Sequence, residues 1–368
     1  EHNFSRYNFF LINYLLNKNE ISEAKIIIED SRKKHDSNLL LKETEFLLLK
    51  NENQKIKSFF NCKKPTDSIA EFFYVIANLY SSEKAYRLSN FYLKISLFLN
   101  NNFLSNKALL AENFHNQKKY NLAKNLYTSL QTIGPAYSWH ASKNNALINL
   151  EKDGKKSSIN KLKKKFKAIK NPNFENYYEL ANFYKDYDYY EESIKYYTIA
   201  LNKISNDHFL VSKILDRRGT SFERIGDWKN AEKDLIKSLK ILPNQPNVLN
   251  YLGYSWIDMG INLDKGLEMI KKAMKLKEND AYITDSLGWA YYAKKKYNKA
   301  EFYLQDAVKL LPQDPVINDH YADSLWMLNK NIQARYIWNH VLSLESADLE
   351  LKNQINKKLI FGIKKINN

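Results

Sequence analysis

The stretch "NYLGYSWIDMG", residues 250–260, places a glycine among large apolar residues in a segment that otherwise has the character of a helix. Glycine inside a helix costs about 1 kcal/mol relative to alanine. A related stretch, "DSLGWAYY" at residues 285–292, places Gly288 in the same setting as Gly253. A glycine that recurs in the same setting indicates a structural repeat in which two helices come unusually close together.

Small residues recur along most of the chain at a similar interval. The first series has a spacing of about 35 residues and consists of Ala77, Ala111, Ala146, Ala181, Gly219, Gly253, Gly288 and Ala322. A second series follows the first at a short, nearly constant offset and consists of Ser89, Ala123, Ser158, Ser193, Ala231, Gly266, Ala300 and Ala334. The two series predict antiparallel helix pairs whose axes approach closely where both side chains are small.

This pattern resembles the tetratricopeptide repeat, a helix–turn–helix unit of about 34 residues. The copy at residues 281–314 matches best, with Leu287, Gly288, Tyr291, Ala300, Leu304 and Pro312 on the pattern. The resemblance implies an all-α fold, a right-handed superhelix or α-solenoid of stacked hairpins. We expect one continuous stack with degenerate hairpins at residues 1–69, eight repeats at 70–348 and a capping helix at 349–368.

Composition and motif searches favour a protein without catalytic or metal chemistry. Cys62 is the only cysteine, so internal disulfides and cysteine zinc clusters are excluded. The seven histidines lack metal-site spacing, and the sequence has neither a glycine-rich phosphate loop nor a nucleophile elbow. His320 lies beside Asp319 and Asp323, where we interpret it as a packing or capping residue. We therefore expect a non-enzyme with no cofactor, no metal and no catalytic residue.

Residues 246–345 contain the candidate partner-binding groove. In stacked hairpins the first helix of each pair lines the concave side, which such proteins use for binding. Aromatic and acidic residues alternate at the positions expected to face this side: Asn250, Tyr254, Asp258, Tyr282, Asp285, Trp289, Tyr292, Asp319, Asp323 and Trp326. Tyrosine and tryptophan are typical binding hot spots, and carboxylates would favour a partner bearing Lys or Arg. The alternative is that these aromatics pack between helices and the acids are ordinary solvated residues.

A strongly basic stretch, "KKSSINKLKKKFKAIK" at residues 155–170, contrasts with this groove. Its apolar residues Leu162, Phe166 and Ile169 predict an amphipathic helix, the second of its hairpin. The candidate basic surface consists of Lys161, Lys163, Lys164, Lys165 and Lys167. A solvated face, an anionic lipid surface and an acidic partner all remain as interpretations. Nucleic acid is disfavoured, because the aromatic residues lie away from the lysines.

A narrower resemblance bears on function. The motifs "VLNYLGYSW", "DSLGWAYY" and "DPVINDH" within residues 246–345 are similar to exported or envelope-associated bacterial tetratricopeptide proteins. The resemblance implies periplasmic or envelope-associated scaffolding through a protein or peptide partner. The alternative is a cytoplasmic adaptor or nucleic-acid-associated protein that uses the basic helix. Because the chain begins at Glu1, we expect an upstream segment, such as a signal peptide, to have preceded it.

Overall fold

The computed structural model describes residues 5–34 and 38–363, and in these ranges it contains helices and no strand. The chain divides into two compact units, Glu1–Pro172 and Asn173–Asn368. The helices of the first unit are α1 (Ser5–Asn17), α2 (Ile21–Lys34), α3 (Leu39–Leu49), α4 (Asn53–Phe59), α5 (Pro65–Ser82), α6 (Tyr86–Leu99), α7 (Leu104–Asn116), α8 (Tyr120–Leu130) and α9 (Pro135–Lys167). The all-α prediction is confirmed, whereas the domain limits and the single continuous stack stay predictions.

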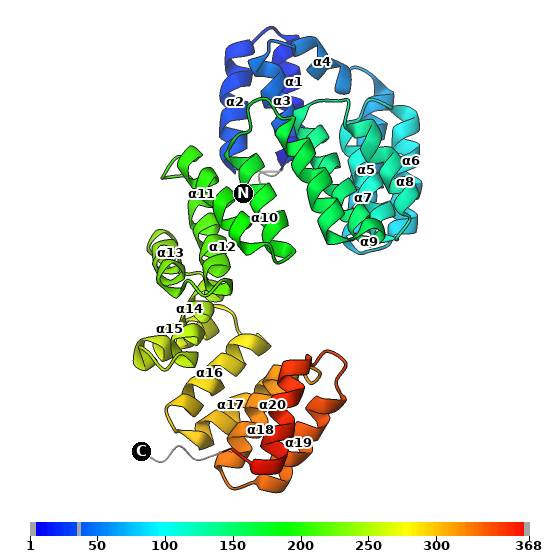
Figure 1. Ribbon diagram of the computed structural model, residues 1–368. Helices are drawn as coiled ribbons and strands as arrows, with labels where there is room; N and C mark the ends of the chain where they lie inside the picture. The colour runs from blue at the N-terminus through cyan, green and yellow to red at the C-terminus, as the bar shows by residue number, and fades with distance from the viewer. Residues whose placement is uncertain (1–4, 35–37, 364–368) are drawn as a thin grey trace. The chain divides into compact units, whose positions relative to one another are not determined.

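The second unit is a series of helical hairpins followed by one further helix (Figure 1). Its helices are α10 (Phe174–Asp186), α11 (Tyr190–Lys203), α12 (Leu210–Arg224), α13 (Trp228–Ile241), α14 (Pro246–Asp258), α15 (Leu263–Leu276), α16 (Ala281–Ala293), α17 (Tyr297–Leu310), α18 (Pro315–Met327), α19 (Asn331–Ser343) and α20 (Leu349–Phe361). Each even-numbered helix from α10 to α18 packs along the helix that follows it.

The first helices of these hairpins line the inner side of the stack. Helix α14 packs on α16, and α16 packs on α18, so successive first helices touch one another. Among the described residues, no comparable packing joins α13 to α15 or α15 to α17. Neighbouring hairpins therefore converge at their first helices and diverge at their second helices. The surface of α14, α16 and α18 is called the inner face below.

The predicted small residues lie where the two helices of a hairpin meet, and they are buried. A Cβ atom on Gly253 would lie 2.8 Å from the carbonyl oxygen of Gly266, and one on Gly266 would lie 2.8 Å from that of Gly253. The two backbones of α14 and α15 are thus in direct contact. In the first unit, Ser89 Oγ uses the same closeness to donate a 2.7 Å hydrogen bond to the carbonyl of Ala77. The close-approach interpretation of the repeat is confirmed.

The turns inside the hairpins also repeat. Lys118, Gly226 and Lys295 follow their first helices with φ of 58°, 81° and 56°, which is the left-handed region. One residue of this kind reverses the chain direction within a few residues, so the second helix can fold back on the first. Asp227 then caps α13, because its carboxylate accepts a hydrogen bond from the backbone N–H of Asn230.

The long helix α9 contains two predicted elements. At Gly154 the backbone departs from helical geometry, with φ of 78° and ψ of 166°. Ser158 Oγ donates a 2.5 Å hydrogen bond to the carbonyl of Ala146, as the equivalent serine of the first repeat does. The two halves of α9 therefore form the third hairpin, and the basic stretch begins its second helix as predicted. Ile169 lies beyond the end of α9 at Lys167.

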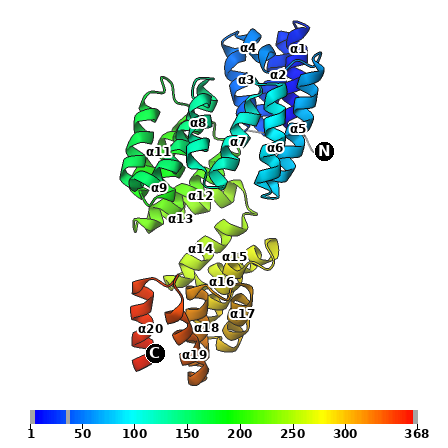
Figure 2. The same cartoon turned by 90° about the vertical axis from the view of Figure 1, so that its right-hand side faces the viewer.

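The N-terminal hairpins of the first unit pack back onto the repeats that follow them (Figures 1 and 2). Helix α3 packs on α7 and α9, and the fully buried carboxylate of Glu43 accepts a hydrogen bond from the backbone N–H of Ala136 at the start of α9. Burial raises the pKa of Glu43, and the backbone donors of α9 oppose that rise. Arg6 pairs with Glu71 and covers the ring of Tyr74 at 3.8 Å.

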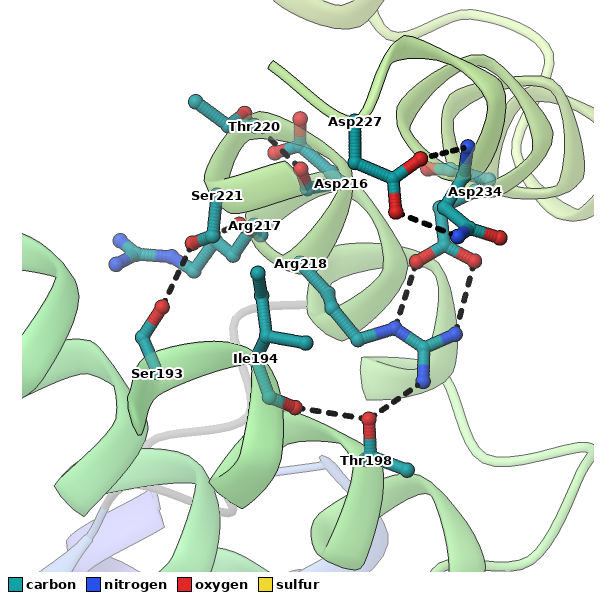
Figure 3. A network of polar contacts seen from close by, with 12 residues as sticks. Ser193, Ile194, Thr198, Asp216, Arg217, Arg218, Thr220, Ser221, Asp227 and Asp234 are labelled. Carbon is teal, nitrogen blue, oxygen red and sulfur yellow. Dashed lines mark hydrogen bonds and ion pairs between the residues drawn. The ribbon is translucent and has the colours of Figure 1, made fainter. Parts of the chain in front are cut away.

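A polar network joins adjacent hairpins of the second unit (Figure 3). Arg218 on α12 donates hydrogen bonds of 2.6 and 2.9 Å to the carboxylate of Asp234 on α13. It donates a third, of 2.9 Å, to Thr198 on α11. Because Asp234 is 4% exposed, removal of the arginine would leave a buried carboxylate without its cation. The network fixes α12 against both of its neighbours.

We expect Gly253→Ala to destabilise the second unit despite the better helix propensity of alanine. The new methyl group would meet the backbone of Gly266, so α14 and α15 must separate, at a cost of roughly 1–3 kcal/mol. Gly219→Ala is the matched control, because its methyl group would meet nothing closer than 3.1 Å. Urea unfolding followed by tryptophan fluorescence measures both. Equal midpoints for the two variants would contradict close approach as the reason for Gly253.

Candidate functional site

The structure gathers the predicted groove residues on three inner helices of the second unit. We call this set the acid–aromatic strip: Asn250, Tyr254 and Asp258 on α14; Tyr282, Asp285, Trp289 and Tyr292 on α16; Asp319, Asp323 and Trp326 on α18. The helices place these residues together because α16 packs on both α14 and α18. Binding at these residues stays a prediction, and their surroundings show which of them are open to a partner.

A buried histidine lies at the centre of the strip. Nδ1 of His320 lies 3.0 Å from both carboxylate oxygens of Asp285, so it forms a hydrogen-bonded pair across α16 and α18. The imidazole ring stacks on Trp289 with 4.0 Å between ring centroids, and Trp289 stacks on Tyr292 at 4.6 Å. The Trp289 ring therefore already makes two stacking contacts within the chain. The prediction of His320 as a packing residue agrees with this arrangement.

Lysine from the last helix occupies the acidic end of the strip. Lys358 on α20 places its ammonium nitrogen 2.8 Å from Asp319 and 2.8 Å from Asp323. The indole N–H of Trp338 donates to the same two carboxylates, at 3.1 and 3.2 Å. Asp319 and Asp323 are only 7% and 6% exposed. The expectation that these carboxylates are open to a cationic partner therefore needs correction, because the chain already supplies a cation to them.

Trp326 is also engaged by the closing segment. A Cβ atom on Gly362 would collide with the Trp326 ring, so this glycine lies directly against the indole. The Trp326 ring also lies 5.4 Å from that of Trp338, and the guanidinium of Arg335 lies 5.1 Å from its centroid. Trp326 thus packs between α18, α19 and the end of α20. For this residue the structure favours the packing alternative.

The open part of the strip lies on α14 and at the start of α16. Asp258 is exposed and Tyr282 is 58% exposed, with its hydroxyl donating a 3.4 Å hydrogen bond to Asp314. Tyr254 is half-buried, and burial together with Asp258 and Asp285 raises its pKa. Asn250 is half-buried as well, and its Oδ1 is shielded from solvent with no hydrogen-bond partner among the described residues. Asp258 and Tyr282 are thus the exposed residues of the predicted site, and Asn250 and Tyr254 are partly accessible beside them.

Three groups in the closed part of the strip favour their protonated forms. Burial raises the pKa of Asp323 to about 7, and neighbouring Asp319 adds to the rise. Burial lowers the pKa of His320, but Asp285 outweighs it, so the net shift is upward. Burial likewise opposes the charge on Lys358, and the attraction of Asp323 and Asp319 raises its pKa overall. The folded cluster therefore holds more protons than the unfolded chain does near neutral pH.

The sequence does not reveal the two side chains that close the site. It places His320 near the strip, but the pairing of His320 with Asp285, 35 residues away, has no sequence signature. Lys358 belongs to α20, outside the repeat register, so no repeat position points to it. A lysine on an otherwise amphipathic capping helix is the only signal that the sequence offers.

The basic helix has the amphipathic character that the sequence predicts. Ile159, Leu162 and Phe166 are 1–7% exposed, whereas Lys164, Lys165 and Lys167 are exposed. Lys161 is exposed too, and Lys163 is half-buried. A shallow, open depression on this helix is lined by Lys156, Ser157, Asn160, Lys161 and Lys164. The only ring on this helix is buried, so the surface offers lysines without an aromatic platform for bases.

The part of the chain that the structure describes lacks the features of a metal site and of a membrane span. No group of three or more His, Cys, Asp or Glu side chains in this part of the chain could hold a metal ion. In the same part of the chain, no helix combines the length and apolar character needed to cross a bilayer.

Comparison with known proteins supports the repeat assignment. A tetratricopeptide repeat-containing protein of Pseudomonas aeruginosa is 32% identical to this chain over 126 residues. That match covers 34% of this chain and 20% of the relative, so the chain corresponds to about a fifth of the relative's length. No family model matches the chain.

Solved structures include proteins of the same fold. A tetratricopeptide repeat protein from Parabacteroides merdae has a TM-score of 0.50 at 19% identity, covering 61% of this chain and 88% of its own. A second such protein, from Thermus thermophilus, has a TM-score of 0.43 at 17% identity, covering 51% of this chain and 99% of its own. With the repeat register and the buried small residues, the first of these matches defines an α-solenoid of helical hairpins. The fold of this chain is thus similar to that of tetratricopeptide repeat proteins.

We expect the stability of the second unit to fall as pH rises from 5 to 8. Asp323 has a folded pKa above its unfolded value, so the folded state holds an extra proton over this range and loses that advantage as pH rises. His320, with its raised pKa, acts in the same direction. The free energy of unfolding should fall by at least about 1 kcal/mol over this range, which corresponds to somewhat under one pKa unit. Urea unfolding followed by tryptophan fluorescence measures it.

Five of the six tryptophans lie in the second unit, so this signal reports mainly on it. Asp323→Asn should flatten the pH dependence, because asparagine does not titrate. The exposed Asp306, which pairs with Lys309 on α17, provides the control variant Asp306→Asn, which should keep the wild-type slope. An unchanged slope in Asp323→Asn would contradict the assignment of the proton to this cluster.

Proposed function

We propose that the chain is a non-catalytic scaffold that binds a segment of a partner protein on the inner face of its second unit. Support comes from the fold, whose concave surfaces commonly bind extended segments. It also comes from the open residues Asn250, Tyr254, Asp258 and Tyr282, which combine aromatic contact area with a carboxylate. Such surfaces provide affinity through rigid tyrosines and orientation through charge.

The observation that carries the proposal is the position of Lys358. Its ammonium group is held by Asp319 and Asp323 on the same face and lies 6.0 Å from the centre of the Trp338 ring. Within the chain itself, a pair of carboxylates beside an aromatic ring thus holds a lysine side chain. A partner bearing Lys or Arg would meet one carboxylate and one ring at Asp258 and Tyr254, a turn apart on α14, and a further ring at Tyr282 near the start of α16.

We expect selection of a displayed random dodecapeptide library on the full chain to enrich peptides rich in Lys and Arg. Tyr254→Ala combined with Tyr282→Ala should weaken binding of a selected peptide at least tenfold, because two hot-spot side chains are lost. Fluorescence anisotropy with the labelled peptide measures the dissociation constant. Phe302→Ala combined with Tyr336→Ala is the matched control, since these rings are 61% and 74% exposed on the second helices α17 and α19. If both double variants weakened peptide binding equally, binding on the inner face would be refuted.

The cell-envelope part of the proposal rests on the resemblance of residues 246–345 to exported bacterial proteins. The competing function is a cytoplasmic adaptor or nucleic-acid-associated protein that uses Lys164, Lys165 and Lys167, and contact with an anionic membrane would use the same lysines. What favours this alternative is the exposure of these lysines on one helix face.

Titration with single-stranded RNA at 50 and 200 mM salt separates the two functions. We expect the inner-face scaffold to bind RNA only weakly at both salt concentrations. Backbone-driven binding would instead be tight at 50 mM, fall steeply at 200 mM and disappear in Lys164→Gln/Lys165→Gln/Lys167→Gln. The second outcome, together with recovery of the native protein from the cytoplasmic fraction, would favour the alternative.

A further inference from the structure

The first unit exposes an apolar face on α5. Ile69, Phe72, Ile76 and Leu79 follow one another at intervals of three and four residues, which is the spacing of a helix–helix seam. Ile69, Phe72 and Leu79 are 46%, 61% and 62% exposed, and Val75 beside them is 44% exposed. A folded monomer rarely leaves a complete seam of this kind uncovered.

The repeat register shows that this face normally carries a neighbouring helix. The four equivalent positions of the next repeat, on and just before α7, are Phe103, Asn106, Leu110 and Asn113, and all are at most 5% exposed. They are covered by α6, whose residues Ser96 and Ser89 hydrogen-bond to Asn106 and Asn113. Helix α5 is preceded by α4, which has only seven residues, and among the described contacts α4 does not pack along α5. The α5 face is thus a hairpin face without its usual covering helix.

The exposed apolar surface continues onto α6. Leu88, Phe91 and Phe98 are 49%, 58% and 89% exposed. A chain of ring contacts links the two helices: Phe72 to Phe73 at 5.7 Å, Phe73 to Tyr92 at 5.9 Å, and Tyr92 to Phe91 at 5.3 Å between centroids. The α5 and α6 residues therefore belong to one surface, which we call the hairpin face.

Two other second helices carry polar residues at all three register positions of Leu88, Phe91 and Phe98. In α13 these positions hold Asn230, Lys233 and Lys240, and in α15 they hold Lys265, Glu268 and Lys275. Large apolar residues at all three positions of α6 are therefore not required by the hairpin fold itself. They extend the uncovered seam of α5 into a broader contact surface.

The size of the hairpin face matches one half of a stable interface. With about 200 Å² for a fully exposed phenylalanine, the three phenylalanines alone expose roughly 400 Å². That is already within the range of the largest apolar patch on a typical monomer. The four aliphatic side chains bring the total towards the roughly 800 Å² that each partner buries in a standard protein–protein interface.

The neutral seam on α5 allows a second copy of this chain to be the occupant. The chain has a net charge of +16, so two copies repel each other unless they meet through an uncharged surface. The only charged residues of α5 are Asp67 and Glu71, and both are engaged within the chain: Asp67 accepts from the backbone N–H of Asn61, and Glu71 pairs with Arg6. The α5 seam is thus neutral and can face its own copy, whereas the exposed Arg87 and Lys94 on α6 would have to point out of the contact.

We infer that the protein forms a twofold-symmetric dimer in which the hairpin face of one chain packs on the hairpin face of another. With a twofold axis, the same patch forms both halves of the interface. Each copy then covers the apolar face of the other, and no such face is left exposed. The α5 seams of the two copies would replace the covering helix that α4 does not provide.

Sedimentation velocity of the full chain from 0.5 to 50 μM tests the dimer. The apparent mass of the wild type should be twice the 43.4 kDa of one chain. Leu79→Glu combined with Phe98→Glu should weaken dimerisation at least 100-fold, because four carboxylates would enter an apolar contact. Both residues are highly exposed, so the far-ultraviolet circular dichroism of the monomer should match the wild type. Phe302→Glu combined with Tyr336→Glu is the control and should remain dimeric.

A wild type that stays monomeric at 50 μM would overturn the inference. So would a wild type whose dimer persists unchanged in Leu79→Glu/Phe98→Glu. A membrane as the true occupant is revealed by flotation with vesicles of phosphatidylcholine and phosphatidylglycerol. In that case a monomeric wild type floats with the vesicles and the Leu79→Glu/Phe98→Glu variant does not, which also overturns the dimer.

Discussion

Close approach of two helix backbones is the constraint on which the rest of this structure depends. At Gly253 and Gly266 the two helices touch carbonyl to Cα, and elsewhere alanine or serine allows nearly the same distance. Each hairpin is therefore a thin, flat element that can be stacked. The first helices converge and the second helices diverge. Stacking of the hairpins therefore creates an inner face, and no additional sequence feature is needed to form it.

The repeating part of the fold could be predicted because its determinant is local. A small residue in the first helix and its counterpart in the second set the helix pair, and the left-handed residue at Lys118, Gly226 or Lys295 sets the turn. The packing of α3 on α9 could not be predicted in this way. It depends on a buried carboxylate, Glu43, that meets the backbone of Ala136, 93 residues later and outside any repeat position.

The candidate site shows the same division. Repeat register placed the ten strip residues on three adjacent helices, since register determines which side of a helix a residue occupies. It could not show that Trp289 stacks on His320, or that Asp319 and Asp323 pair with Lys358. Those facts depend on side-chain pairing between different hairpins and the last helix. The accessible portion of the site is consequently smaller, and lies nearer α14, than the sequence indicated.

The lysine on α20 gives the end of the chain a role beyond covering an apolar surface. Its ammonium group neutralises two carboxylates that the last full hairpin buries, so the hairpin and the closing helix form one electrostatic unit. A boundary drawn at the end of the repeats, after Ser343, would separate this unit and leave two buried carboxylates without their cation in a poorly solvated pocket. The smallest self-sufficient fragment of the second unit therefore extends at least to Gly362, well beyond the last helix of the repeat itself.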